Sequence, residues 1–185
     1  MSRDVLSAIQ SRISAAKLAE PGPSAAQLEQ LLLAAVHAPD HGRLAPWRFA
    51  ILEGASRKVL GDALATVLRR KHPDATEDML ATERAKALRA PTIVAVAAHP
   101  NRAHKVPESE QVLAVAAAVQ NLILAAGALG FGTMWKTGAP AYEAGVKQAL
   151  GFEPDDQIVG FVYLGTTATP GQPRQRSLEG VVRRI

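Results

Sequence analysis

Arg12 and Ser14 place a guanidinium and a hydroxyl two residues apart, where a predicted N-terminal helix ends. Both side chains donate hydrogen bonds, and a guanidinium also makes charge-assisted contacts with phosphate oxygens. On a backbone that bends at this point, the two groups could address one phosphate. The same residues also suit a solvated arginine beside a serine that caps the helix, so the pattern by itself leaves both interpretations open.

His37 and His41 flank the turn dipeptide Pro39–Asp40, and this cluster is more polar than a turn requires. Histidine and aspartate are common metal ligands. No second cluster completes a coordination shell, since His99 and His104 stand on a separate segment of the sequence. We therefore expect no metal site here. Donation to an anionic or carbonyl-bearing ligand and a merely exposed turn remain as the two interpretations.

Three glycines precede the short segment Thr133–Gly138, which holds Trp135. A dinucleotide-binding fingerprint needs its glycines between a strand and the helix that follows it. Gly127, Gly130 and Gly132 instead follow a helix and lead into a strand, which is typical of a helix cap and a tight turn. Trp135 is expected to pack at the strand edge, from which it could also border a planar ligand.

The composition of the chain excludes several classes of chemistry. With 185 residues and no cysteine, disulfides, thiol catalysis and cysteine-based zinc or iron–sulfur sites are ruled out. The formal net charge of +4 comes from basic and acidic residues interspersed along the chain, so we expect no nucleic acid partner. No P-loop and no Ser/His/Asp arrangement is recognisable. The first ten residues lack the apolar run of a signal peptide, and we expect a cytoplasmic protein with no membrane contact.

The candidate residues must be positioned by a long apolar segment, residues 111–130, which has almost no polar face. A helix that is apolar all round is either buried in a larger body or crosses a membrane. Gln120 and Asn121 fall in the middle of the segment, and amides are costly among lipid tails, so a buried core helix is favoured. Glu108 and Glu110 precede it and suit the positive end of the helix dipole better than a paired acid–base site.

The rest of the chain alternates between helix and strand patterns. Helices are expected over residues 4–14, 24–38, 55–70, 76–89 and 141–150, and strands over residues 47–52, 93–98, 133–135 and 158–164. The 93–98 segment is apolar without alternation, which predicts a strand covered on both faces. With no repeat and no linker, the pattern indicates one α/β or α+β sandwich domain. The tail from residue 166 shows no period before Leu178.

Five segments stand in a fixed order along the chain. They are Arg12-Ile13-Ser14 with Lys17 after it, the turn and strand at residues 38–49 (APDHGRLAPWRF), the helix at 117–126, the glycine loop and strand at 130–135, and the strand at 158–165. Together they resemble the Arg-Arg-Ser motif, Ala-Pro turn, central helix, loop and last core strand of the nitroreductase family of flavoproteins. The resemblance covers about residues 5–168, and the short middle section resembles the compact YdjA-like branch.

This resemblance implies a nitroreductase-like α+β fold, an α/β sandwich with a central mixed sheet flanked by helices, formed by residues 1–185 as a single FMN-binding domain. It also implies an intertwined homodimer with FMN at the interface. By position, the FMN-binding residues would be Arg12, Ile13 and Ser14 at the phosphate and ribityl end, His37 and His41 from the other subunit, and Trp135, Lys136 and Thr137 along the isoalloxazine. Backbone N–H groups near Thr137 and Gly138 would face flavin N5.

The implied activity is that of an FMN-dependent NAD(P)H oxidoreductase. A hydride would pass from the nicotinamide to the flavin and then to a nitroaromatic, quinone or similar acceptor by a ping-pong route. No side chain need act as an acid, because solvent can supply protons, so the chemistry would be centred on the flavin. Two alternatives stay open: a flavin-binding dimer without turnover, acting as a carrier or sensor, and a dimeric scaffold with an eroded site.

Two positions depart from the family pattern. Ile13 stands where the family has its second arginine, so one phosphate contact is missing. Ala45 stands where a glutamine is usual before Pro46, so an amide contact is lost. Other branches place basic residues of the tail near the phosphate, and Arg174 and Arg176 could compensate in this way.

Overall fold

The structure, a computed structural model, describes residues 4–167 and 171–185 and is built around one sheet. Its strands in these ranges are β1 (Leu18–Ala19), β2 (Trp47–Glu53), β3 (Thr92–Ala98), β4 (Gly132–Lys136) and β5 (Gln157–Thr167). They follow the order β1-β5-β3-β2, and β4 also pairs with β5. Each of these pairings is antiparallel. The expectation of a mixed sheet, with parallel and antiparallel pairs, was therefore wrong. Helical connections let neighbouring strands run in opposite directions here.

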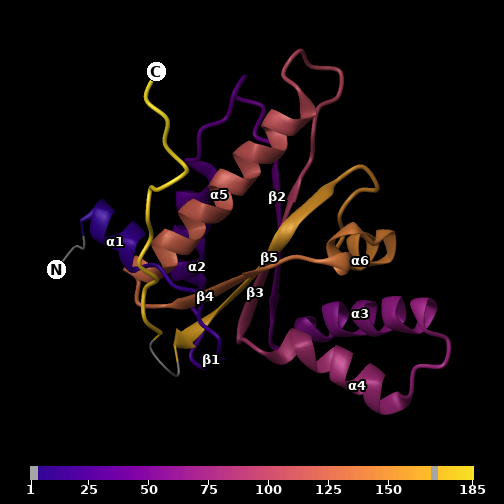
Figure 1. Ribbon diagram of the computed structural model, residues 1–185. Coiled ribbons are helices and arrows are strands. Elements are labelled where there is room, and N and C mark those ends of the chain that lie inside the picture. Colours follow the sequence, from indigo (N-terminus) through magenta and orange to yellow (C-terminus); the bar gives the residue numbers. More distant parts are fainter. Residues whose placement is uncertain (1–3, 168–170) are drawn as a thin grey trace.

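Helices cover both faces of this sheet. They are α1 (Val5–Ser11), α2 (Ala25–Val36), α3 (Arg57–Lys71), α4 (Glu77–Ala85), α5 (Glu108–Ala128) and α6 (Ala144–Ala149), with short 3-10 turns at Gly54–Ser56, Lys86–Leu88 and Ala139–Tyr142. Figure 1 shows α1, α2 and α5 on one side of the strands and α3, α4 and α6 on the other. The three layers confirm the α+β sandwich with helices flanking the sheet.

Alternating side chains of β3 separate two hydrophobic clusters. Val94 and Val96 pack with α2 and α5, whereas Ile93 and Ala95 pack with α3 and α6. Every residue of β3 is buried, which confirms the strand that was expected to be covered on both faces. Burial of both faces explains why this segment has no polar alternation, because neither face meets water.

The polar amides of α5 lie where backbone groups can satisfy them. The buried Gln111 donates to the carbonyls of Asn101 and Val106 at 3.1 and 3.0 Å. Asn121 donates to the carbonyl of Ala34 in α2 at 3.3 Å. Within the described ranges, α5 is the helix long and apolar enough to cross a membrane, but its buried residues pack against the sheet. It is therefore the core helix of this fold, as the sequence predicts.

Three elements differ from the expectation. The two-residue strand β1 falls in a segment where neither a helix nor a strand was expected, and it pairs with the end of β5. The helix expected over 141–150 is a 3-10 turn followed by the shorter α6, because Glu143 is extended between them. The expected amphipathic helix at the N-terminus exists as α1, but no residue of it is buried.

Candidate functional site

The backbone bends where Arg12 and Ser14 were expected to meet an anion. α1 ends at Ser11, and Arg12 has an extended conformation with φ −62° and ψ 127°. Three residues on, the Ala15 N–H donates to the Thr133 carbonyl of β4 at 2.8 Å. This bond fastens the segment to the edge of the sheet and fixes Arg12 and Ser14 beside β4.

A cavity of about 440 Å³ opens between this segment, α5 and β4, and we call it the α5-side cavity. It is lined by Arg12, Ser14, Gln120, Ile123, Thr133, Trp135 and Thr137. Successive side chains of a strand point to opposite faces, so Thr133 and Trp135 share the face toward α5, and Thr137 follows directly after the end of β4. The structure thus brings Trp135 and Thr137 together with Arg12 and Ser14, residues more than 120 positions away in the sequence.

Trp135 is held against the neighbouring strand. Its indole Nε1–H donates to the Val159 carbonyl at 3.3 Å, and 36% of the residue is exposed. A Cβ added to Gly160 would lie 2.0 Å from that nitrogen, so only glycine leaves room for the indole here. The ring therefore has a fixed position at the border of the cavity.

Lys136 does not follow the expectation. Its side chain lies on the opposite face of β4, in a second cavity next to α3, and its Nζ is 5.0 Å from the centre of the Tyr163 ring. The expectation grouped Trp135, Lys136 and Thr137 as one run and overlooked the two-residue period of a strand.

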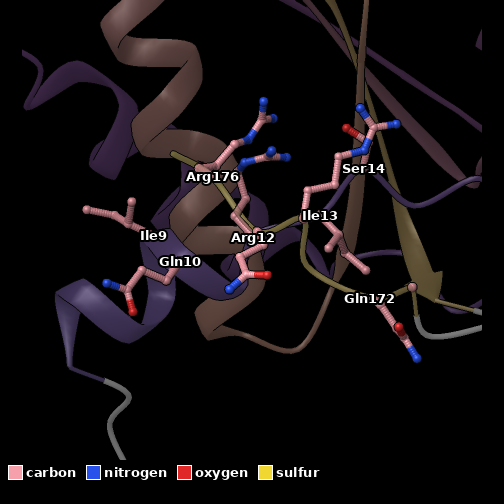
Figure 2. Close-up of a pocket in the computed structure, with 10 residues that line it drawn as sticks. Ile9, Gln10, Arg12, Ile13, Ser14, Gln172 and Arg176 are labelled. Carbon is pink, nitrogen blue, oxygen red and sulfur yellow. The ribbon is translucent and has the colours of Figure 1, made fainter. Parts of the chain in front are cut away.

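The C-terminal tail reaches the same region. Figure 2 shows a cavity, about 800 Å³ in volume, that joins the Arg12 segment to residues 171–176. Arg174 and Arg176 line it together with Arg12 and Ser14, and the side chains of Arg12 and Arg176 extend the same way. Its described lining contains no carboxylate. The tail arginines therefore lie where the departures from the family pattern led us to look for them.

Ile13 has a structural role in this arrangement. A Cβ on Gly171 would lie 2.9 Å from the Ile13 Cδ1 atom, so the tail backbone passes closely over the isoleucine. An arginine at this position would have carried a fourth positive charge into the cavity that Arg12, Arg174 and Arg176 line. The apolar side chain instead gives the tail a surface to pack on, close to Arg12.

The two histidines lie elsewhere in the chain. His37 Nδ1 is 2.7 Å from the Leu33 carbonyl, and His41 Nδ1 is 2.6 Å from Glu110 Oε2 in the first turn of α5. Glu110 and Ile123 are separated by thirteen residues of one helix, which correspond to about 20 Å along its axis. A single chain therefore does not bring His41 to the α5-side cavity.

The turn that carries His41 is closed by Asp40, whose Oδ2 accepts the Ala45 N–H at 2.6 Å. Arg43 and Ala45 have left-handed backbones, with φ of 54° and 47°. Side chains other than glycine adopt this region at a cost, so the turn is held in a strained form. Ala45, the second departure from the family pattern, thus contributes its backbone N–H to the turn.

Three lining residues of the α5-side cavity, Gln120, Ile123 and Thr133, escaped the sequence reasoning. Gln120 and Ile123 are three residues apart and therefore share a helix face. Thr133 shares the face of Trp135 through the strand period. The sequence contains both spacings, but it does not show which face of α5 meets which face of β4. These residues could therefore not be assigned to one site.

The fold and this site define an α+β sandwich with arginines beside a fixed indole at the edge of its sheet, and comparison with known proteins names its class. The family model described as "Nitroreductase family" matches residues 9–166, so the chain belongs to the nitroreductase family. The chain is 39% identical over 165 residues to a proposed NAD(P)H nitroreductase, YdjA of Escherichia coli K12, with 88% of each chain covered. It is 36% identical over 165 residues to a proposed NAD(P)H nitroreductase of Haemophilus influenzae, again with 88% of each covered.

Solved structures share the fold. The nitroreductase-like family protein from Bacillus cereus has a TM-score of 0.85 at 23% identity, covering 100% of this chain and 97% of that one. A proposed nitroreductase from Desulfovibrio desulfuricans, solved in complex with FMN, has a TM-score of 0.77 at 24% identity, covering 100% and 98%. These likenesses establish the nitroreductase-like fold of the chain.

Proposed function

We propose that this chain is an FMN-dependent NAD(P)H oxidoreductase that works as a homodimer in the cytoplasm, with residues 1–185 forming one FMN-binding domain. One observation carries the proposal. Arg12 and Ser14 line both the α5-side cavity and the cavity of the tail arginines, so the two cavities adjoin. An anionic end and a planar body of one ligand would therefore be held side by side. The names of the relatives, NAD(P)H nitroreductases, support the same activity.

The residues present suit the two ends of FMN. Arg12, Arg174 and Arg176 offer guanidinium donors to a phosphate, and Ser14 adds a hydroxyl. Trp135 and Ile123 offer flat and apolar surface to a ring system. When bound, FMN supplies hydride acceptance from NAD(P)H and hydride donation to a nitroaromatic, quinone or similar acceptor in a ping-pong sequence.

The chain's own contribution to the chemistry is positioning. Thr137 and Gly138 follow the last ladder pair of β4, which joins Lys136 and Phe161. Gly138 has a φ of 107°, a conformation that glycine adopts without strain. Backbone N–H groups beyond a ladder can donate to a ligand atom that gains electron density, and they do so without reorganisation. We propose that no side chain acts as a proton donor and that solvent supplies the protons.

A second copy of the chain would complete the site. Val5, Leu6 and Ile9 of α1 are 70%, 70% and 48% exposed, as is Leu113 of α5 at 66%. Such apolar residues on one side of a molecule mark a surface for another chain. A two-fold axis would bring His37 and His41 of the partner to the α5-side cavity, which they do not reach within one chain.

The first experiment measures flavin affinity. FMN should bind to the protein, and Arg12→Ala should weaken binding by about 1–3 kcal/mol, or about 5- to 150-fold, because a charge-assisted contact is lost. Arg69→Ala, on the far helix α3, is the matched control and should bind as the parent does. Riboflavin lacks the phosphate, so its affinity should not respond to Arg12→Ala. Absence of flavin binding, or equal behaviour of the two variants with FMN, contradicts the proposal.

The second experiment separates an enzyme from a carrier or sensor. Anaerobic mixing with NADH or NADPH should bleach the oxidised-flavin band near roughly 450 nm, and addition of a quinone should restore it. Binding of FMN without bleaching by either nucleotide would favour the non-catalytic flavin-binding dimer.

The third experiment tests the shared site. Arg12→Ala and His41→Ala each damage both sites of a homodimer. A mixed dimer of the two variants has one site with an intact Arg12 and an intact His41, so exchange of subunits should restore tight FMN binding to one site per dimer. If each site were built within one chain, mixing would restore nothing.

A further inference from the structure

A second cavity lies on the other face of β4, and we call it the α3-side cavity. It has a volume of about 350 Å³ and lies where α3, the 3-10 turn at Lys86–Leu88, β4 and β5 meet. In Figure 1 this is the side of the sheet that faces α3 and α4. Thr137 lines both cavities, so the two are separated by the thickness of one strand.

The floor of this cavity is apolar. Leu60, Leu64, Phe161 and Tyr163 line it, and all four are at most 6% exposed. Leucine and aromatic side chains of this kind favour a ligand with an apolar, ring-sized body. The volume is at the lower end of the range of about 300–1,000 Å³ that is usual for small-molecule sites.

The rim carries an excess of positive charge. Lys71, Lys86 and Lys136 line the cavity with His72, whereas Glu83 is the single carboxylate among its described lining residues. Two of the three lysines are neutralised. Lys86 pairs with Glu83 at 2.5 Å, and Lys71 pairs with Glu143 at 2.6 Å.

Lys136 is the lysine that differs. Within the described ranges it makes no ion pair, and its nearest compensation is the face of the Tyr163 ring, 5.0 Å away. Burial lowers its pKa, and the charges of Arg89 and Lys86 lower it further. A cation in this position, above an apolar floor, would be stabilised by an anion placed in the cavity.

We propose that the α3-side cavity binds a small carboxylate with a ring-sized apolar body, its carboxylate at Lys136 and its ring over Phe161 and Leu64. This site goes beyond the proposed function, because it lies on the opposite face of the sheet from the FMN residues and needs no flavin. A compact ammonium suits a carboxylate as a point charge, and the remaining lysines of the rim are already paired.

The test uses benzoate as the probe and benzamide as its neutral counterpart, titrated by calorimetry into flavin-free protein. Benzoate should bind at least about tenfold more tightly than benzamide, since only benzoate makes a charge-assisted contact. Lys136→Met should remove that preference, and Lys136→Arg should retain part of it. Lys58→Met, an exposed lysine of α3 that does not line the cavity, should bind benzoate as the parent does. Arg12→Ala should also leave benzoate binding unchanged.

Four results would overturn the proposal. Benzoate and benzamide could bind equally, or neither could bind at millimolar concentration. Lys136→Met could bind benzoate as tightly as Lys58→Met. Loss of benzoate binding in Arg12→Ala would place the probe in the α5-side cavity instead. Each result is obtained without FMN, so failure of this proposal is distinct from failure of the proposed flavin enzyme.

Discussion

β4 divides two cavities of similar size, about 440 and 350 Å³, and the same five-residue strand supplies a wall to each. The α5-side cavity has the Arg12 guanidinium and a fixed indole, whereas the α3-side cavity has lysines over a floor of leucine and aromatic rings. Adjacent residues of one strand thus line two cavities that differ in their chemical character. Trp135 and Lys136 are neighbours in sequence but point to different faces of the sheet. Adjacent residues of a strand should therefore be assigned to different sites, according to the face that each one shares with every second residue.

The two faces also differ in how complete they are within one chain. On the α3 side, Arg70 and Lys71 pair with Glu143, which links α3 to the start of α6. On the α5 side, α1 contributes no buried residue. On the α3 side, ion pairs within the chain thus join the elements, whereas the exposed apolar residues of α1 form a surface that the proposed second copy would cover.

The largest expected effect comes from the glycine that both faces depend on. Gly160→Ala would place a methyl group 2.0 Å from the Trp135 Nε1 atom and 3.0 Å from the Lys136 carbonyl oxygen. The indole must move, so we expect a loss of about 1–3 kcal/mol in the free energy of unfolding, together with weaker FMN binding. Urea unfolding and FMN titration at one fixed protein concentration measure the two effects.

Gly145→Ala is the matched control for this substitution. Gly145 lies in α6, and a Cβ there meets no atom within 4 Å. Alanine should stabilise the helix by up to about 1 kcal/mol, since it has less conformational entropy to lose. Equal behaviour of the two alanine variants would show that the indole is not fixed by Gly160.

A smaller effect tests the charged end of the α5 side. Arg176→Gln should weaken FMN binding by about 0.5–1.5 kcal/mol, less than Arg12→Ala, because a tail residue is exposed and screened by solvent. Arg183→Gln, which does not line the cavity, should have no effect on the titration. The effect of Arg176→Gln should shrink as salt is raised, and a salt-independent loss would contradict an electrostatic contact.

The α3 side should show its own dependence on pH. Hydrogen bonds from Lys71 and then Arg70 hold the pKa of Glu143 below its ordinary value of 4.5. A lowered folded-state pKa means that the unfolded chain takes up the proton first, so this stability is present above about pH 4.5 and is lost as pH falls. In Glu143→Gln, the free energy of unfolding should therefore change less between pH 6 and pH 3 than it does in the parent. An unchanged pH dependence would show that the ion pairs of Glu143 do not contribute to it.

The smallest expected effect concerns Lys136 without a ligand. Because its folded-state pKa is lowered, the charged lysine costs stability at neutral pH, and this cost disappears as pH rises toward the ordinary value of 10.5. Lys136→Met should thus raise the free energy of unfolding slightly at pH 7. Lys58→Met should change it by no more than about 0.5 kcal/mol in either direction. A clear destabilisation by Lys136→Met would mean that its ring contact outweighs the cost of burial.

The elements with strong patterns could be predicted from the sequence. β3 and α5 were recognisable because complete burial leaves an apolar run that no exposed element tolerates. α2 was recognisable because Ser24 and Gln27 form a capping box, which the structure contains. The antiparallel direction of the strands was not encoded in any local pattern, since it depends on how the helices connect them.

The candidate site was predictable in part. Arg12 and Ser14 were candidates because a bend after a helix leaves their side chains available, and Trp135 because it lies in a strand after a glycine loop. Thr137 was named only through the family resemblance. The distance between His41 and the α5-side cavity could not be predicted, because it depends on which end of α5 each segment meets. The position of Arg174 and Arg176 depended on a packing contact between Ile13 and Gly171, which no spacing in the sequence reveals.

The contact between Ile13 and Gly171 has a consequence for biosynthesis. Arg12 is translated before the segments of both hydrophobic clusters, whereas Arg174 and Arg176 are translated only after them. The full set of cations therefore exists only on a chain whose core has already been made. On the proposed function, capture of the cofactor is a late event of maturation, and a nascent chain arrested before residue 174 would be an apoprotein.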